Sequence, residues 1–334
     1  EMVRVFACIS TEMVEQTRQN HNTSPVMTAA LGRLLTAGSL MGLMMKNPTD
    51  LLTLEIGGAG PGGGLLVTAT SDGYVKGYPK VSDVILPPKN GKLDVGGAFV
   101  PGILRVIKDM GLKEPYNSTV ALQSGEIAED LTYYFATSEQ IPSSVGLGVL
   151  MNKDNTVKVA GGFILQLMPF ADDKTLETLE NNIKILPPVT DMLSDGLSPE
   201  DIIGRLFDGL ETTIHETMPI GLRCDCGKER ITKALMTLPK SDIEEMINDG
   251  KPVEVRCQFC CRKYDFPYEH VPSKAMFQYR RAFYRNDGER YKKYLEDVKS
   301  GNKKMHADTL YPYDIVESCL ALPADPEQRK ILDI

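Results

Sequence analysis

The stretch that decides how this chain is organised is Cys224-Asp225-Cys226, which is followed after thirty residues by Cys257-Gln258-Phe259-Cys260. Four of the seven cysteines therefore fall into a Cys-x-Cys pair and a Cys-x-x-Cys pair. Two such pairs can bring four thiolates around one tetrahedral metal ion, and thiolates are ligands that zinc prefers. The spacing predicts a structural zinc site, with one Zn²⁺ per chain in the reduced state.

Buried thiols or ordinary disulfides would be the alternatives to a metal site. Buried thiols have no reason to pair twice at this spacing, and nothing in the sequence marks the chain as secreted. The pair Cys224 and Cys226 is the more informative one. Residues i and i+2 of an extended chain lie up to about 7 Å apart at Cα, so a disulfide between them must bend the backbone into a small strained ring. Strained disulfides are the labile, regulatory kind, which indicates a redox function.

The region around the cysteines, residues 217–266, is small and has few large apolar side chains. Modules of about fifty residues lie near the limit at which a core maintains itself, and binding of structural zinc then contributes ~10–16 kcal/mol to folding. An oxidant that pairs the thiols would remove the ligands and the fold with them. Flanking basic side chains would offset the charge of a zinc tetrathiolate and favour reactive thiolates, although a solvated basic face is an equally good interpretation. These residues are Arg223, Lys228, Arg230, Arg256, Arg262 and Lys263.

Helices are predicted on both sides of the first cysteine pair. In residues 171–216, Asp172 is expected to cap one helix, and Ser198-Pro199-Glu200-Asp201 to begin another. These amphipathic pieces are too short to be stable alone, so they must pack on a neighbouring apolar surface and would lose order without it. Within 217–266, helices are expected at 229–238 and from Ser241, with a strand at 253–257.

Residues 1–170 have the pattern of an α+β domain. Strands are expected near 3–8, 51–56, 65–70, 74–78, 103–108, 118–122, 131–137, 146–151 and 156–167, with helices at 11–20 and 24–45. The glycine run 57–64 suggests a phosphate-binding loop, but no Gly-Lys-Ser/Thr follows it and the next element is a strand. We therefore reject nucleotide binding and predict a turn between two strands.

The composition is that of an ordinary globular protein, with 42% hydrophobic and 25% charged residues in 334. The net charge of −8 argues against coating nucleic acid as the main function. No apolar run reaches eighteen residues and no basic-then-apolar leader is present, so we predict a cytoplasmic protein without a membrane partner. The first residue is Glu1 and not Met, and a strand is already expected from Val3, so we expect that the natural start is missing. The four histidines form no triad, and no catalytic residue is predicted.

Several stretches resemble one bacterial family, the redox-regulated holdase chaperones known as the thirty-three-kilodalton heat-shock proteins. They are SEQIPSSVG at 138–146, GGFILQLMP at 161–169, the glycine turn at 57–64, and the four cysteines together with Tyr264. The resemblance covers about residues 3–266. It implies a chaperone core at 1–170, a metastable helical linker at 171–216 and a four-cysteine redox-switch module at 217–266.

The resemblance also implies a mechanism and partners. Reduced, zinc-bound protein is idle; oxidation yields the disulfides Cys224–Cys226 and Cys257–Cys260, zinc leaves, and the linker unfolds. The protein then holds unfolding client proteins without ATP, commonly as a homodimer. The resemblance thus implies a stress-response chaperone and not an enzyme.

Two features depart from that family. Cys261 adds a fifth thiol beside the second pair, and we interpret it as a spectator, with entry into the metal shell or a wrong disulfide as alternatives. Residues 267–334 form a foreign-looking tail that faintly resembles an uncharacterised domain found beside von Willebrand A-type modules. A helix pair is expected at 273–284 and 289–300, where aromatic and basic residues interleave. A solvated amphipathic helix is favoured over contact with RNA, and a gene fusion or assembly artefact would also produce such a tail.

Two other functions fit the same cysteines. A thiol-disulfide oxidoreductase could use Cys257 and Cys260, but the βαβ pattern of thioredoxin-like proteins does not surround them. A constitutive zinc ribbon that binds nucleic acid or protein would lose its binding on oxidation, whereas a redox-regulated chaperone would gain it.

Overall fold

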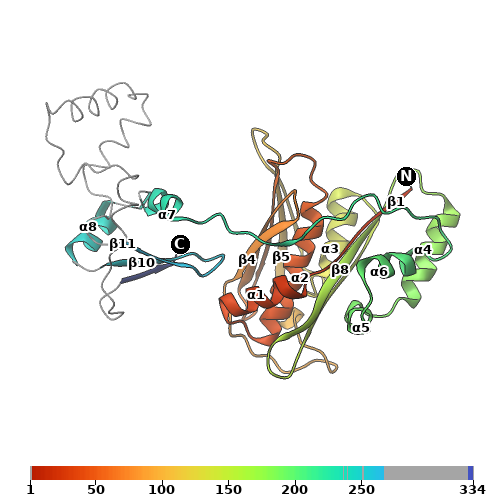
Figure 1. The fold of residues 1–334 in the computed structure, drawn as a ribbon, viewed down its shortest axis with the longest axis horizontal. Coiled ribbons are helices and arrows are strands. Elements are labelled where there is room, and N and C mark those ends of the chain that lie inside the picture. The colour runs from red at the N-terminus through yellow and green to blue at the C-terminus, as the bar shows by residue number, and fades with distance from the viewer. Residues whose placement is uncertain (1, 236, 239, 250–251, 267–329, 334) are drawn as a thin grey trace. The chain divides into compact units, whose positions relative to one another are not determined.

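The computed structural model describes all residues except 1, 236, 239, 250–251, 267–329 and 334 (Figure 1). It divides into two compact units, Glu1–Cys224 and Asp225–Ile334, which are described separately. The strands of the first unit are β1 (Val3–Ile9), β2 (Leu51–Gly58), β3 (Gly64–Thr70), β4 (Tyr74–Pro79), β5 (Gly102–Asp109), β6 (Tyr116–Ala121), β7 (Ser143–Met151), β8 (Val157–Leu167) and β9 (Gly221–Leu222). Its helices are α1 (Thr11–His21), α2 (Pro25–Gly42), α3 (Ala128–Tyr134), α4 (Asp173–Ile185), α5 (Val189–Ser194) and α6 (Pro199–Leu206), with short helical turns η1 (Gly96–Ala98) and η2 (Phe135–Glu139).

Helix α2 lies at the centre of the first unit, between two sheets (Figure 1). One sheet has the order β1-β8-β7 and the other β6-β5-β2-β3-β4-β9. All residues of α2 except Pro25 and Arg33 are buried, because the helix faces a sheet on either side. Its first turn follows the expected chemistry: Pro25 occupies the first position and the Ser24 hydroxyl accepts a hydrogen bond from the Met27 amide. The predicted α+β class is confirmed.

The glycine run between β2 and β3 makes a close backbone approach. A Cβ at Gly58 would overlap the Phe99 carbonyl, and one at Gly60 would overlap the Ala98 carbonyl. The Gly62 amide donates to the same Ala98 oxygen at 2.9 Å. These glycines therefore allow one loop to pack on another, which explains the motif without a phosphate ligand.

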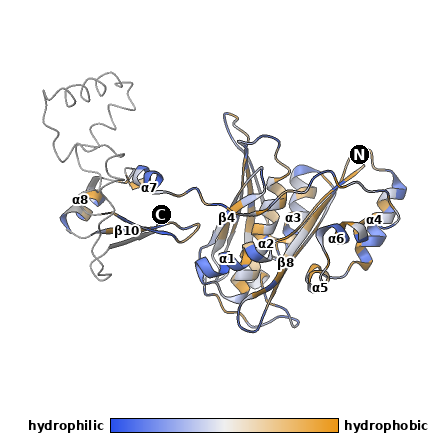
Figure 2. Ribbon diagram, in the orientation of Figure 1, coloured by the Kyte–Doolittle hydropathy of each residue, from blue (hydrophilic) through white to orange (hydrophobic). Residues whose placement is uncertain are grey.

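Helices α4, α5 and α6 cover one face of the β1-β8-β7 sheet. Leu179, Ile202 and Leu206 are buried against Phe163 and Leu165 of β8 in a cluster separate from the main core. Figure 2 shows hydrophilic and hydrophobic residues alternating along α4 and α6, as expected for helices with one packed face. Both predicted caps are confirmed, since Asp172 accepts from the Thr175 amide at 2.7 Å and Ser198 forms a capping box with Asp201.

One predicted strand is wrong. Residues 131–137 belong to α3 and to a turn of π-helix at Phe135–Glu139. The buried side chains Leu131, Tyr134 and Phe135 have the i, i+3, i+4 spacing of a helix, which the aromatic content of the stretch obscured. The carboxylate of Asp130 stabilises the preceding loop by accepting amide hydrogen bonds from Gln123, Ser124, Gly125 and Ile127.

The second unit is small. Its described elements are α7 (Lys228–Leu235), α8 (Lys240–Asn248), β10 (Val253–Arg256), β11 (Lys263–Phe266) and β12 (Lys330–Asp333). Strands β10 and β11 form an antiparallel hairpin, and β12 pairs with β10 in parallel. The predicted tail helices at 273–284 and 289–300 lie outside the described residues. Within the described part of the chain, no helix combines the length and apolarity needed to cross a membrane.

Candidate metal centre

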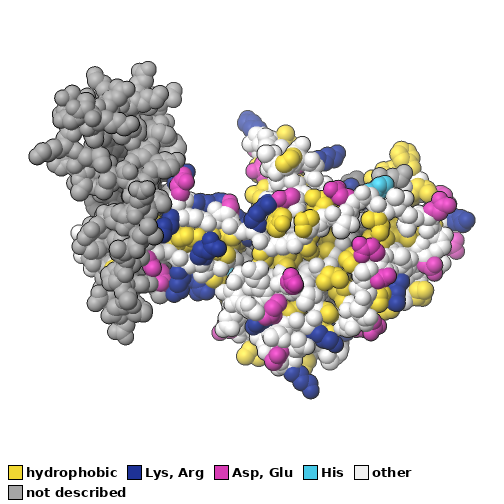
Figure 3. Space-filling view, in the orientation of Figure 1, with side chains coloured by type: hydrophobic (Ala, Val, Ile, Leu, Met, Phe, Trp, Pro, Cys, Tyr) yellow, Lys and Arg dark blue, Asp and Glu magenta, His cyan; other side chains and the backbone are white. Residues whose placement is uncertain are grey.

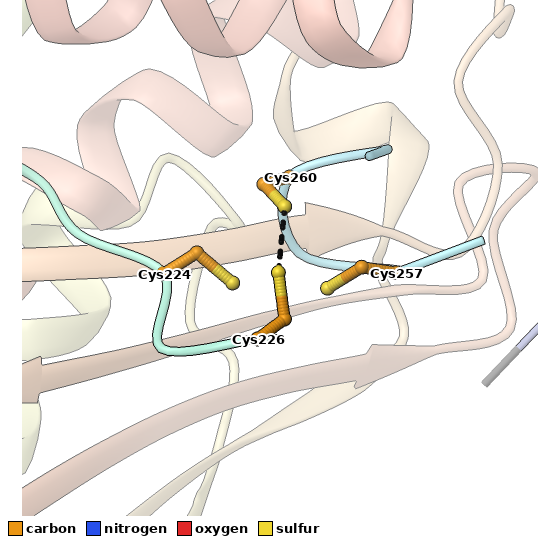
Figure 4. A group of neighbouring side chains, drawn as sticks. All are labelled: Cys224, Cys226, Cys257 and Cys260. Atoms are coloured by element: carbon orange, nitrogen blue, oxygen red, sulfur yellow. Dashed lines mark hydrogen bonds between the residues drawn. The ribbon is translucent and has the colours of Figure 1, made fainter. Parts of the chain in front are cut away.

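Two loops carry the four paired cysteines. Cys224 and Cys226 lie between β9 and α7, and Cys257 and Cys260 lie in the turn of the β10–β11 hairpin. Backbone hydrogen bonds fix that turn: the Cys257 amide donates to the Arg262 carbonyl at 3.0 Å, and the Cys261 amide donates to the Cys257 carbonyl at 2.8 Å. The side chains of all four cysteines point toward a common centre (Figure 4).

The distances between the sulfurs fit one tetrahedral ion. All four Sγ atoms lie within 4.8 Å of one another, and those of Cys226 and Cys260 are 3.2 Å apart. Thiolates held at ~2.3 Å from one zinc ion would be separated by about 3.8 Å, which lies within this range. Cys257 is buried and the other three are half-buried, as expected for ligands of an ion partly shielded from water. The arrangement that the spacing predicted can hold a metal ion.

Tyr264 on β11 contacts Cys226 of the first cysteine pair. Its hydroxyl donates to the Cys226 carbonyl at 3.2 Å and lies 3.3 Å from the Cys226 sulfur. Burial of the ring and the hydrogen bond to Cys226 raise the pKa of Tyr264 to about 12, so the hydroxyl keeps its proton at neutral pH. The hydrogen bond to the Cys226 carbonyl holds the loop of the first cysteine pair against the β10–β11 hairpin. The residue pattern alone gave Tyr264 no role, because the contact depends on the hairpin register.

Basic side chains gather on the described part of the second unit (Figure 3). The pKa of Arg262 is raised by the hydrogen bond to Tyr264 and by the charges of Cys226 and Cys260. Arg230 forms an ion pair with Asp225, and Lys263 pairs with Glu254 at 3.0 Å. Arg223 is hydrogen-bonded to Asp72 in the first unit. The charges of Cys226 and Cys260 thus act on Arg262, whereas Arg230, Lys263 and Arg223 pair with carboxylates.

Two further described cysteines lie outside the group of four. Cys261 follows Cys260 directly and has a left-handed backbone, with φ at 57°. Cys8 on β1 is buried in the main core, and burial raises the pKa of its thiol to about 12. A thiol with so high a pKa is an unreactive core residue at neutral pH.

Comparisons with known proteins agree with this geometry. Residues 1–267 match the Hsp33 protein family, and residues 256–332 match a domain of unknown function, DUF2828. The chain is 57% identical over 270 residues to the 33 kDa chaperonin of Lachnoclostridium phytofermentans, covering 80% of this chain and 92% of that protein. It is 50% identical over 273 residues to the 33 kDa chaperonin of Clostridioides difficile, with coverage of 80% and 93%.

A solved structure shares the fold. The crystal structure of the 33 kDa chaperonin from Thermotoga maritima matches with a TM-score of 0.77 and 39% identity, covering 84% of this chain and 94% of that one. The resemblance seen in the sequence is thus confirmed, and so is the tail's resemblance to an uncharacterised domain. The chain belongs to the Hsp33 protein family.

Proposed function

We propose that this protein is a redox-regulated chaperone, an ATP-independent holdase that binds unfolding proteins in the cytoplasm during oxidative stress. The single observation that carries the proposal is the cluster of four thiols within 4.8 Å, in a module whose described core is very small. Membership of a family whose relatives are named chaperonins supports the chaperone part. The functional divisions we propose are a core at 1–170, a linker at 171–216, a switch module at 217–266 and the tail at 267–334.

In the reduced state, Cys224, Cys226, Cys257 and Cys260 would hold one Zn²⁺. When bound there, the ion would cross-link the loop before α7 to the β10–β11 turn. The described core of the module consists of Ile231, Leu235, Ile243, Met246, Val253, Val255, Tyr264 and Phe266. A core of this size cannot maintain the fold alone, so the metal cross-link would supply the remaining free energy of folding.

Oxidation would remove the ligands. A peroxide takes two electrons from each cysteine pair: two thiols and one H₂O₂ give one disulfide and two waters. The pairs Cys224–Cys226 and Cys257–Cys260 can no longer act as thiolate ligands once they are bonded. The module would then unfold, because its sulfurs no longer converge on one point.

Loss of the module would destabilise the linker. Helices α4, α5 and α6 have between six and thirteen residues, and helices of this length are not stable in isolation. Their release would expose apolar side chains of β8, including Phe163 and Leu165, to client proteins. We expect the oxidised form to act as a homodimer, which would present two such surfaces.

The decisive experiment measures zinc content and client protection together during a peroxide titration at mildly elevated temperature. We expect one zinc per chain and no suppression of client aggregation before oxidation, and strong suppression as zinc is released. Equal protection by the reduced and oxidised forms would contradict the redox part of the proposal. An insulin-reduction assay on the same samples distinguishes a thiol-disulfide oxidoreductase from a chaperone.

A further inference from the structure

The residues immediately before the first cysteine pair add a strand to the first unit. We call residues 219–223 the strap. Within it, β9 pairs in parallel with β4 through Gly221 with Tyr74 and Leu222 with Val75. The Arg223 amide extends the ladder by donating to the Val75 carbonyl at 2.9 Å. The strap therefore occupies the outer edge of the six-stranded sheet.

The edge that the strap occupies has its own hydrogen-bonding groups. The Lys80 amide donates to the Gly64 carbonyl, so alternate residues from Lys80 back along β4 face β3. Val75 and Gly77 therefore turn their backbone amides and carbonyls outward, where an extended chain can pair with them. Pairing with β9 involves only Tyr74 and Val75, so the strap covers part of an edge that continues to Pro79. Edges of this kind accept additional strands.

The apolar side chains of the strap contact the protein core. Ile220 and Leu222 are partly buried against the main hydrophobic cluster, and their i, i+2 spacing places them on the same side of an extended chain. Gly73, with φ at 83°, makes room for the strap, because a Cβ there would lie 3.0 Å from the Pro219 carbonyl oxygen. The surface beside β4 is therefore shaped for alternating apolar side chains.

The side chain of Arg223 holds the end of the strap. Its guanidinium donates to both carboxylate oxygens of Asp72, at 2.7 and 2.9 Å, and to the Thr70 hydroxyl at 3.0 Å. It also lies 4.5 Å from the ring centroid of Tyr74. We call this ion pair between Arg223 and Asp72 the clamp. Because about half of the surface of both side chains is exposed, the clamp is weak in spite of its good geometry.

We propose that the outer edge of β4 is a client-binding surface that the strap occupies in the metal-bound state, and that an extended client segment replaces the strap after oxidation. This inference rests on the proposed function and names the partner: a segment with apolar residues two apart, followed by a cation that can reach Asp72. Release follows from chain geometry, because Cys224 comes directly after Arg223. The Cys224 sulfur belongs to the cluster of four, so loss of the shared ion would free the Cys224–Cys226 loop and with it the adjoining end of the strap.

The clamp is tested with two variants, Arg223→Ala and Asp72→Asn, which weaken it from opposite sides. Arg105→Ala is the matched control, since it removes an arginine that pairs with Glu55 on the same sheet at 3.1 Å but does not touch the strap. In reduced protein with wild-type zinc content, we expect hydrogen exchange of amides 219–223 to be about fivefold faster in both variants, as for loss of one well-formed exposed ion pair. We also expect measurable client protection without oxidant, which the control should lack. Arg223 is adjacent to the metal ligand Cys224, so Arg223→Ala could reduce metal binding directly. Asp72→Asn leaves Arg223 in place and therefore tests the clamp without that effect.

The binding surface is tested by competition with a peptide of residues 218–223, Met-Pro-Ile-Gly-Leu-Arg. Added at about 1 mM to oxidised full-length protein, a concentration suited to weak binding, it should reduce client protection by about twofold or more. A control peptide with serine in place of isoleucine and leucine should have no effect. The inference is overturned if both clamp variants match the wild type at every oxidant dose, or if the two peptides act alike. Those results would leave the redox gating of the wild-type protein intact, whereas failure of the proposed function itself would appear as protection by reduced wild type.

Discussion

The described parts of the two units differ most in how much core each one buries. The main cluster of the first unit contains 35 buried apolar residues, whereas the described part of the second contains eight. A core of the first size supports a fold by hydrophobic burial alone, and one of the second size does not. On the proposed function, the protein thus joins a self-sufficient sheet-and-helix body to a module whose shape depends on four sulfurs. We therefore expect the small unit to respond to oxidants, whereas the large apolar surfaces belong to the first unit.

The largest expected effect is on the small unit alone. Cys226→Ser removes one ligand and the hydrogen-bond partner of Tyr264, so most of the ~10–16 kcal/mol of metal-dependent folding energy should be lost. We expect zinc below one per chain and loss of the module's helical signal in circular dichroism, while the melting transition of the first unit remains. Cys261→Ser is the control and should retain the zinc. A Cys226→Ser protein with full zinc and an unchanged spectrum would show that the module does not need its fourth ligand.

The next largest effect concerns the linker helices. Ile202→Ala removes a fully buried side chain from the cluster in which α6 packs on the β1-β8-β7 sheet, which should cost about 2–5 kcal/mol locally. The reduced variant should therefore show faster amide exchange in α4 to α6 and a lower oxidant dose for half-maximal client protection. Leu35→Ala, in the main cluster, has a similar cost but should lower the melting temperature of the first unit without changing that dose. Equal dose responses for the two variants would indicate that the linker does not control client binding.

Much of the difference between the two units could be predicted from the sequence, because it depends on local sequence patterns. The cysteine spacing, the caps at Asp172 and Ser198, and the glycine turn each depend on residues close together in the chain. Residues 131–137 were predicted as a strand, because their aromatic residues favour strands, but they belong to α3 and the π-helical turn, which follow the loop that Asp130 holds. The strap could not be predicted, since a two-residue strand has no periodicity and its partner β4 lies about 150 residues earlier.

A smaller effect tests the large unit by pH. Glu15 on α1 accepts hydrogen bonds from Arg18 at 2.9 and 2.6 Å and from the Val157 amide at 2.9 Å, and these partners lower its pKa to about 2. A carboxyl whose pKa is lower in the folded state stabilises the fold above its unfolded pKa, near 4.5, and loses that contribution as pH falls to about 2. Glu15→Gln should therefore cost about 1–2 kcal/mol at pH 7.

The same variant supplies its own control at low pH. The difference in unfolding free energy between wild type and Glu15→Gln should shrink between pH 4.5 and 2, as measured by urea denaturation. A difference that is constant over this range would mean that packing of the side chain, and not its charge, stabilises α1 against β8.

The smallest expected effect separates two roles of Cys261. Its φ of 57° lies in the left-handed region, which costs a residue with a Cβ about 1 kcal/mol and costs glycine almost nothing. Cys261→Gly should therefore stabilise the β10–β11 turn and raise the chelator concentration for half-release of zinc about fivefold. Cys261→Ser removes the same thiol but keeps the Cβ, so it should leave that concentration unchanged. If serine and glycine gave the same increase, the thiol would be competing for the metal, and backbone strain would not explain the result. The comparison of the two variants thus decides whether Cys261 is a spectator in a strained turn or an alternative ligand. The strain should be measurable because the described core of this module is small.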